Sequence, residues 1–142
     1  MNVAKILESK GSEIVSLEVG CSIMDVAKLL GARRIGSIPI VAGTKLAGII
    51  SERDIVRGLA IKGADVLDEP VDTLMSKTVF TCRKDDTVQH LMTIMTDRRI
   101  RHIPVMDGEK MIGMVSIGDL VKERMQEAEQ EADALKEYIG TA

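Results

Sequence analysis

One polar motif occurs twice in the sequence, as Ser51-x-x-Asp54 in GIISERD and as Ser116-x-x-Asp119 in GMVSIGD. A serine with a carboxylate three residues later is a capping box, in which each side chain binds a backbone amide at a helix start. The same residues suit a ligand, because an aspartate accepts two hydroxyl hydrogen bonds and a helix amino terminus attracts anions. Both motifs therefore predict a helix start, and context must decide whether they also bind a ligand.

The first motif also contains a cation, Arg53, where the second copy has Gly118. A positive charge in the first turn of a helix opposes the helix dipole. Either solvent and the neighbouring Glu52 and Asp54 balance this charge, or it contacts a phosphate bound at the same helix end. The first motif is therefore better suited to phosphate than the second.

Both motifs belong to an internal duplication with an offset of 65 residues. Residues 33–56 align with 98–121 without a gap, and 11 of the 24 positions are identical. Residues 22–30 and 87–95 keep apolar side chains at matching positions. Such a repeat indicates one supersecondary unit used twice, which buries its apolar faces against its neighbour.

Each copy has the pattern of a β-α-β-β-α unit. A first helix begins at Ser22, where apolar residues take helical spacing. It ends near the cations Arg33-Arg34, as its counterpart ends near Arg98-Arg99, and cations suit a helix carboxyl terminus. A hairpin follows, because a glycine turn separates two apolar runs before each Ser-x-x-Asp motif. The expected strands lie at Ile14-Val15, 37–41, 46–50, Val79-Phe80, 102–106 and 111–115.

The last helix is expected to run far beyond the second repeat, as an apolar seam with charged flanks. The seam consists of Val121, Met125, Ala128, Ala132, Leu135 and Ile139, and Gly140 is expected to end the helix. The same helix of a second chain is the expected partner, in a homodimer, and packing on a short helix at Val3–Glu8 is the alternative. The predicted units are repeat 1 with that short helix at 1–62, a linker at 63–70, repeat 2 at 71–125 and a helical extension at 126–142.

Composition argues against several classes of protein. Residues 122–139 hold three basic and six acidic residues, which accounts for the whole net charge of −3, so the rest has no basic excess for nucleic acid. No apolar run approaches a membrane span, and the charged start does not resemble a signal peptide. Cys21 and Cys82 are expected as free thiols in a reducing cytoplasm, and two histidines, His90 and His102, are too few for a metal site.

The duplicated unit, with Ile-Pro on a hairpin strand and Gly-h-h-Ser-x-x-Asp (h, apolar) opening the last helix, resembles a tandem CBS-domain pair, or Bateman module. The resemblance covers roughly residues 3–125. It implies an α+β fold of two β-α-β-β-α CBS repeats packed as a pseudo-twofold pair, here with an extended C-terminal helix. It also implies a regulatory sensor that binds adenosine nucleotides, NAD-type dinucleotides or S-adenosylmethionine in clefts between the repeats.

The resemblance implies a role for each motif residue. Asp54 and Asp119 are expected to bind ribose hydroxyls, and Ser51 and Ser116 to lie near phosphate. The full predicted set is Ser37, Ile38, Pro39, Ser51, Arg53, Asp54, Thr78, Val79, Arg101, His102, Ile103, Pro104, Ser116 and Asp119.

Other members of this set come from strands and connections. Arg101-His102 resemble a basic pair near phosphates in the family and, because the two clefts face each other, can serve a ligand held mainly by the other repeat. Thr78-Val79 are expected to meet the adenine edge through backbone groups. We expect Ile38-Pro39 and Ile103-Pro104 to flank the adenine and ribose. The alternative is that these residues only pack in the core.

We therefore expect a non-catalytic module that binds an adenine nucleotide without a metal and signals energy or redox state to an unknown protein in trans. AMP is the first expectation, with NAD(H) or ATP next. A ligand-independent dimerisation or scaffold module is the alternative. An enzyme is not expected, because the sequence shows no nucleophile–base pair, phosphate-binding loop or acidic dyad.

Overall fold

The computed structural model describes residues 1–11 and 13–141, so Ser12, in the predicted first repeat, and Ala142, in the predicted extension, lie outside the described residues. The order of elements is α1 (Val3–Lys10), β1 (Leu17–Glu18), α2 (Ile23–Arg33), β2 (Ser37–Ala42), β3 (Lys45–Ser51), α3 (Glu52–Lys62), the 3-10 turns η1 (Ala64–Asp68) and η2 (Val71–Thr73), α4 (Val88–Arg98), β4 (His102–Asp107), β5 (Lys110–Ser116) and α5 (Ile117–Thr141). The helices and hairpins of the predicted duplication are confirmed.

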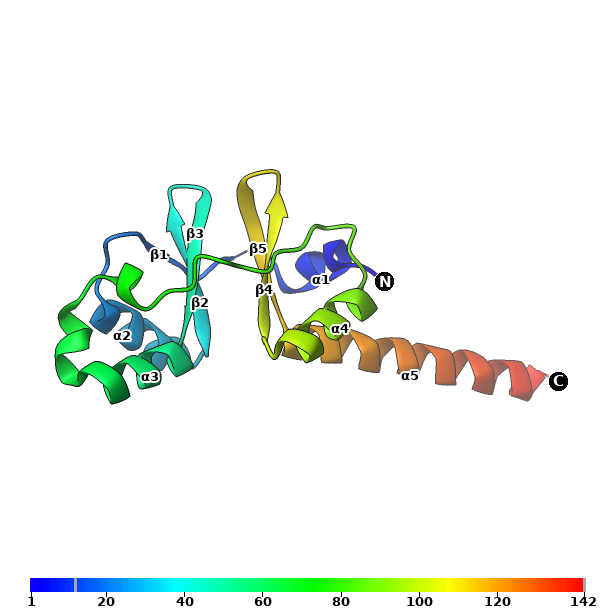
Figure 1. The fold of residues 1–142 in the computed structure, drawn as a ribbon. Coiled ribbons are helices and arrows are strands. Elements are labelled where there is room, and N and C mark those ends of the chain that lie inside the picture. The colour runs from blue at the N-terminus through cyan, green and yellow to red at the C-terminus, as the bar shows by residue number, and fades with distance from the viewer. Residues whose placement is uncertain (12, 142) are drawn as a thin grey trace.

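The strands form one five-stranded sheet in the order β1-β2-β3-β5-β4. Each repeat contributes an antiparallel hairpin, and the two hairpins join through the pair Lys45 and Lys110. Figure 1 shows the hairpins side by side at the centre, with α2 and α3 flanking one and α4 and α5 flanking the other. The predicted α+β architecture of paired repeats is therefore confirmed.

The first strand of each repeat does not lie where it was predicted, at Ile14-Val15 and Val79-Phe80. In the first repeat the strand begins later, and Leu17 of β1 pairs in parallel with Ile40 of β2. In the second repeat the described counterpart is a single parallel bridge between Cys82 and Val105. Such short pairings leave no alternating pattern in the sequence, so the β-branched and aromatic residues before them gave a wrong prediction.

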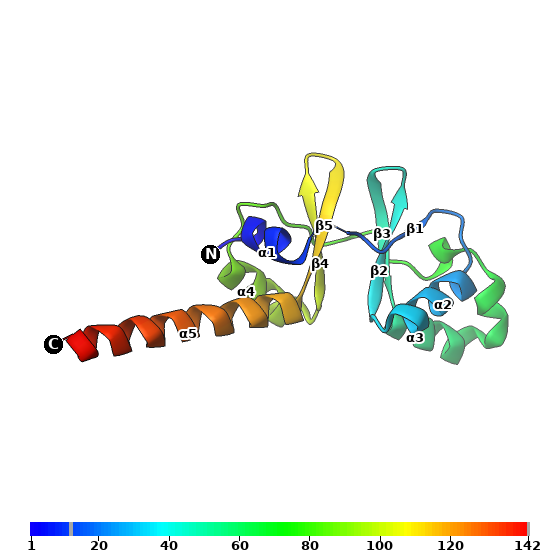
Figure 2. The same cartoon turned by 180° about the vertical axis from the view of Figure 1, so that it is seen from behind.

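Each repeat completes its core with a segment that precedes the other repeat in the chain. Helix α1 buries Val3, Ile6 and Leu7 in the core of the second repeat. Conversely, Val71 of η2 and the nearby Met75 pack in the core of the first repeat. The predicted boundaries place α1 in the first repeat, but Figure 2 shows it beside α4 and β5 of the second. The two repeats are therefore interlocked through exchanged segments.

Helix α5 begins inside the second repeat and then leaves it. Its first turns pack on α4 and α1, where Leu120 and Glu123 are buried. From residue 128 to 140 every side chain is exposed, and Figure 1 shows this part projecting away from the body. Gly140 does not end the helix as predicted, because α5 continues to Thr141. A glycine costs a helix about 1 kcal/mol without necessarily stopping it.

Candidate functional site

The predicted capping boxes are present in both repeats. At the start of α3 the Asp54 amide donates to Ser51 Oγ at 3.2 Å, and the Ser51 amide donates to Asp54 Oδ2 at 2.9 Å. Ser116 and Asp119 make the same two bonds, at 3.2 and 2.9 Å, at the start of α5. In the described structure neither carboxylate uses Oδ1 in a hydrogen bond. Capping and ligand binding are therefore compatible in one aspartate.

A cleft of about 410 Å³ lies beside the start of α3 and takes residues from both repeats. We call it the first cleft. Small-molecule sites usually have volumes of about 300–1,000 Å³. Eight of the predicted residues line it, namely Ser37, Ser51, Arg53, Asp54, Thr78, Val79, Arg101 and His102. The structure thus brings together residues that lie up to 65 positions apart in the sequence.

Eight further lining residues were not predicted, namely Gly36, Ile49, Glu52, Arg57, Ser76, Phe80, Arg99 and Ile100. Arg57 was detectable, because it lies one helical turn after Arg53 on the same face. Arg99 was read as a helix-end cation, and it is the left-handed C-cap of α4 with φ of 54°. The ring of Phe80 lies under Arg98, whose guanidinium carbon is 4.8 Å from the ring centroid. This cation–π contact joins two single residues 18 positions apart, which leave no periodic pattern in the sequence.

The remaining predicted residues lie outside the first cleft. Ile38 and Ile103 are fully buried on β2 and β4, and the prolines that follow them, Pro39 and Pro104, are buried too. This position agrees with the alternative of core packing. Their contact with a ligand stays a prediction, as does that of Ser116 and Asp119.

The charge of the first cleft is positive overall. Its lining includes the four arginines Arg53, Arg57, Arg99 and Arg101 and the two acids Glu52 and Asp54. His102 adds little charge at neutral pH, because burial, with help from Lys10 and Arg101, holds its pKa below the usual value even though Asp119 opposes this. An excess of arginine favours a ligand that carries carboxylate or phosphate groups.

Free polar groups lie at the same end of the cleft. The Glu52 amide donates to the Gly36 carbonyl at 2.9 Å and the Asp54 amide is used by the cap, whereas the described structure gives the Arg53 amide no acceptor. Ser37 Oγ is buried and has no hydrogen-bond partner among the described residues, and Ser37 pairs with Ser51 in the sheet. Buried polar atoms rarely lack a partner. The cleft therefore has donors in place for an oxygen-rich anion.

The second repeat places a side chain of its own on the equivalent carboxylate. Lys10 Nζ, at the end of α1, donates to Asp119 Oδ2 at 2.7 Å and to the Met114 carbonyl at 2.9 Å. Burial alone would raise the pKa of Asp119, but hydrogen bonds from Lys10 and Ser116 hold it below its usual value. Asp119 is thus neutralised from within the chain, whereas no basic side chain of the described structure pairs with Asp54.

In both repeats a neighbouring segment packs closely against the glycine that precedes the Ser-x-x-Asp motif. A Cβ at Gly113 would lie 2.7 Å from Leu7 Cδ2, so α1 packs directly on β5. A Cβ at Gly48 would lie 2.7 Å from the Ser76 carbonyl oxygen. A larger residue would therefore meet backbone at position 48 and the movable end of the Leu7 side chain at position 113.

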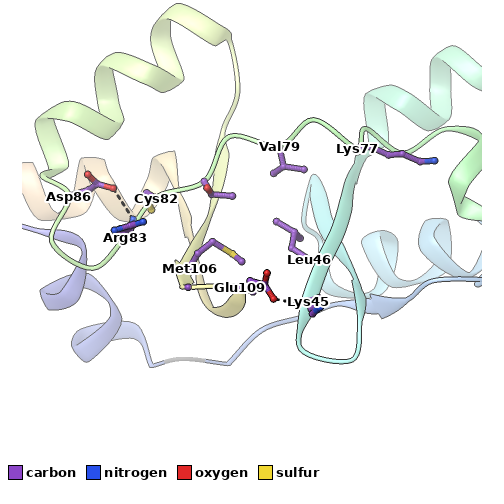
Figure 3. A pocket seen from close by; sticks show the side chains of 11 residues that line it. Lys45, Leu46, Lys77, Val79, Cys82, Arg83, Asp86, Met106 and Glu109 are labelled. Carbon is purple, nitrogen blue, oxygen red and sulfur yellow. Dashed lines mark hydrogen bonds and ion pairs between the residues drawn. The ribbon is translucent and has the colours of Figure 1, made fainter.

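A larger hollow of about 670 Å³ opens between the hairpin tips (Figure 3). Its charged side chains are mainly exposed, and Lys45 pairs with Glu109 at 3.5 Å. Asp86 lies beside Arg83 and accepts from its backbone amide at 2.7 Å. None of the Ser-x-x-Asp residues lines this hollow. The first cleft therefore remains the candidate site despite its smaller volume.

Comparison with known proteins identifies the class. The CBS domain profile matches residues 6–61 and 71–126, so this chain belongs to the CBS domain family. The structure is similar to the CBS-domain containing protein ATU1752 from Agrobacterium tumefaciens, with a TM-score of 0.83 and 38% identity over 87% of this chain and 99% of that one.

Two solved neighbours carry ligands. The CBS domain pair of protein MJ0100 is in complex with 5′-methylthioadenosine and S-adenosyl-L-methionine, and it is 28% identical with a TM-score of 0.77 over 89% of this chain and 98% of that one. The CBS domain protein PAE2072 from Pyrobaculum aerophilum is complexed with AMP, and it is 26% identical with a TM-score of 0.74 over 84% and 89%. CBS domain pairs of this fold therefore bind adenosine-type ligands.

Other kinds of site find little support in residues 1–11 and 13–141. They contain no group of three His, Cys, Asp or Glu side chains placed to hold a metal ion. Burial, with a smaller effect of Asp86, raises the pKa of Cys82 to about 12, which keeps this thiol protonated and unreactive. No helix within this part is long and apolar enough to cross a membrane. CBS domain pairs are in general regulatory and non-catalytic.

Proposed function

We propose that this protein is a non-catalytic regulatory module that binds an adenine nucleotide in the first cleft and signals energy or redox state to another protein in trans. The observation that carries the proposal is the first cleft itself, where Asp54 lies among four arginines at the start of α3. The adenosine-type ligands of MJ0100 and PAE2072 support it. We place the protein in the cytoplasm, where its thiols stay reduced.

In this proposal the two ends of the nucleotide are held by different groups. Asp54 accepts the ribose hydroxyls through the oxygen that capping does not use. The Arg53 amide, Ser37 Oγ and the arginines bind phosphate, and the backbone around Thr78 and Val79 meets the adenine edge. AMP is the first choice of ligand, followed by ATP, ADP or NAD(H). A metal is not required, because the arginines supply the positive charge.

Thermal unfolding of nucleotide-free protein tests the proposal. At about 100 times its dissociation constant a ligand stabilises the folded state by about 2.7 kcal/mol. For a chain of this size that raises Tm by roughly 5–10 °C. The panel is AMP, ADP, ATP, NAD, NADH and S-adenosylmethionine, with GMP as the control for the base. A Tm that none of these ligands moves contradicts the proposal.

The exposed part of α5 favours a second role, as a dimerisation module. Met125, Leu135 and Ile139 of the predicted seam are 60%, 59% and 66% exposed, and Ala128 and Ala132 lie between them. We propose that two chains pair along this seam. Size-exclusion chromatography with light scattering should give the mass of a dimer for the wild type. The double variant with Leu135→Glu and Ile139→Glu should give the mass of a monomer. Gln130→Glu, on the opposite face, is the matched control. A dimer that binds no nucleotide would favour the ligand-independent scaffold.

A further inference from the structure

We propose that Lys10 closes the cleft of the second repeat, so that each chain binds one nucleotide in the first cleft and none beside Asp119. We call the surface around Ser116, Asp119 and Met114 the second cleft. The inference rests on the proposed nucleotide site, because it takes Asp54 as the pattern for Asp119.

The position of Lys10 follows from its contacts. Its ammonium group binds Asp119 Oδ2 at 2.7 Å and the Met114 carbonyl at 2.9 Å. With the 65-residue offset, Asp119 matches Asp54 and Met114 matches Ile49, and these two line the first cleft. Lys10 therefore lies on the residues whose counterparts face open space in the other repeat.

The counterpart of Lys10 behaves differently. The strings LESK and LMSK match Lys10 with Lys77. α1 remains helical up to Lys10, whereas η2 ends at Thr73 and the chain then pairs with β3, where Ser76 and Ile49 exchange backbone hydrogen bonds of 2.9 and 2.8 Å. Lys77 lies at the edge of the hollow between the hairpin tips instead, and its ammonium points away from the other lining residues (Figure 3). The same residue type thus closes one cleft and leaves the other open.

The chemistry of the contact opposes a nucleotide. A ribose diol needs the Asp119 carboxylate as an acceptor, and a ligand must first displace an ammonium that already satisfies it. Displacement also leaves the Met114 carbonyl without its donor. Gly118 supplies no cation in place of Arg53, so a phosphate gains less here than in the first cleft. The partly exposed ion pair alone weakens a competing ligand about fivefold, and the lost donor of Met114 and the missing cation add to this.

Methyl NMR separates the two clefts in one titration. The δ1 methyl of Ile49 reports the first cleft, and the ε methyl of Met114 reports the second. Both are followed while AMP or ATP is added to the wild type, to Lys10→Met and to Lys10→Arg, with calorimetry giving the number of sites. Lys5→Met removes a charge from the same helix and is the matched control.

The wild type, Lys10→Arg and Lys5→Met should show shifts at Ile49 alone, with one site per chain. Lys10→Met should add saturable shifts at Met114 and a second site, and Asp119→Asn in that background should remove both again. Shifts at both reporters in the wild type at similar concentrations overturn the proposal. The proposal is also overturned if the Met114 methyl signal does not shift at millimolar nucleotide in either Lys10→Met or Lys10→Gln, provided that both variants are folded.

Failure of the proposed function gives a different result. If Ile49 stays unmoved in every variant, the first cleft is not a nucleotide site. The Met114 signal still tests the role of Lys10 in that case. Its shift in Lys10→Met and its lack of shift in the wild type depend on the second cleft alone.

Discussion

The carboxylates of Asp54 and Asp119 make the same capping bonds and meet opposite surroundings. Asp54 lies at an open cleft lined by arginines, whereas Asp119 is bound by Lys10 under a packed helix. The cap uses only Oδ2, so it preserves the start of the helix in both repeats whatever the other oxygen does. After a duplication the structural role of such a motif is therefore kept, while its binding role is free to diverge.

Substitution of the two aspartates should give the largest difference between the repeats. Asp54→Asn removes the charge that accepts the ribose hydroxyls, so the affinity for AMP should fall about tenfold to a hundredfold. Its amide oxygen still accepts the Ser51 amide, and the free energy of unfolding should change by about 1 kcal/mol or less. Calorimetry measures the affinity and urea unfolding the stability. Asp119→Asn is the control and should leave the affinity unchanged; similar losses in both variants would contradict the comparison.

The two equivalent glycines should differ in stability. In Gly48→Ala the new methyl meets the Ser76 carbonyl at 2.7 Å and Met75 Sδ at 2.9 Å, and a backbone atom cannot rotate away. The free energy of unfolding should fall by about 1–3 kcal/mol. In Gly113→Ala the methyl meets the end of Leu7 at 2.7 Å, and rotation of that side chain limits the loss to about 0.5–1.5 kcal/mol. The midpoints of urea unfolding compare the stabilities of the two variants. A loss of stability in Gly113→Ala that equals or exceeds the loss in Gly48→Ala would show that α1 is held as rigidly as the chain at Ser76.

Arg53 should matter for the phosphate and not for the nucleoside. Arg53→Gln should weaken AMP by no more than about fivefold, because the side chain is exposed and solvent screens its charge. Adenosine should bind the variant as well as it binds the wild type. Lys122→Gln, which removes a cation from the second repeat, is the matched control in the same calorimetric series. An equal loss for adenosine and AMP would mean that Arg53 shapes the cleft and does not bind phosphate.

The pair of Lys10 and Asp119 should give the smallest effect, and it should depend on pH. The pKa of Asp119 is lower in the folded protein than its ordinary value of 3.8, so its contribution is present above about pH 4 and is lost as the pH falls through the folded pKa. The side chains are 34% and 22% exposed, which limits the contribution to about 1 kcal/mol. Urea unfolding of the wild type and Asp119→Asn should therefore differ at pH 6 and converge below pH 4. Lys10→Met should reduce the pH-dependent part to what the hydrogen bonds from Ser116 supply, and a pH dependence equal to that of the wild type would contradict a role for Lys10.

Features within one repeat could be predicted from the sequence. The glycine turn between two apolar runs predicted the hairpin of each repeat, and the spacing of Ser and Asp predicted both caps. These features depend on neighbours a few residues apart, where spacing has a direct geometric meaning. Two-residue pairings such as Leu17 with Ile40 are too short for that, so the first strands were misplaced.

Contacts between distant segments could not be predicted in this way. Lys10 and Asp119 are 109 positions apart, and no periodicity joins them. The sequence placed α1 beside the repeat that follows it, whereas its apolar side chains complete the other one. The contribution of Arg99 to the first cleft could not be predicted either. Its position at the end of a helix already explained why a cation lies there.

The exchange of segments also sets an order of assembly during protein synthesis. The first repeat has its whole core once residue 75 has left the ribosome, because Val71 and Met75 complete it. Helix α1 is made first, but the Met114 carbonyl that Lys10 binds follows 104 residues later. At ordinary rates of translation that delay is roughly 5–20 s, during which the β5 surface that Leu7 and Lys10 contact does not yet exist. The nascent chain can thus complete the core beside the first cleft before β5, the strand on which α1 and Lys10 pack, has been synthesised.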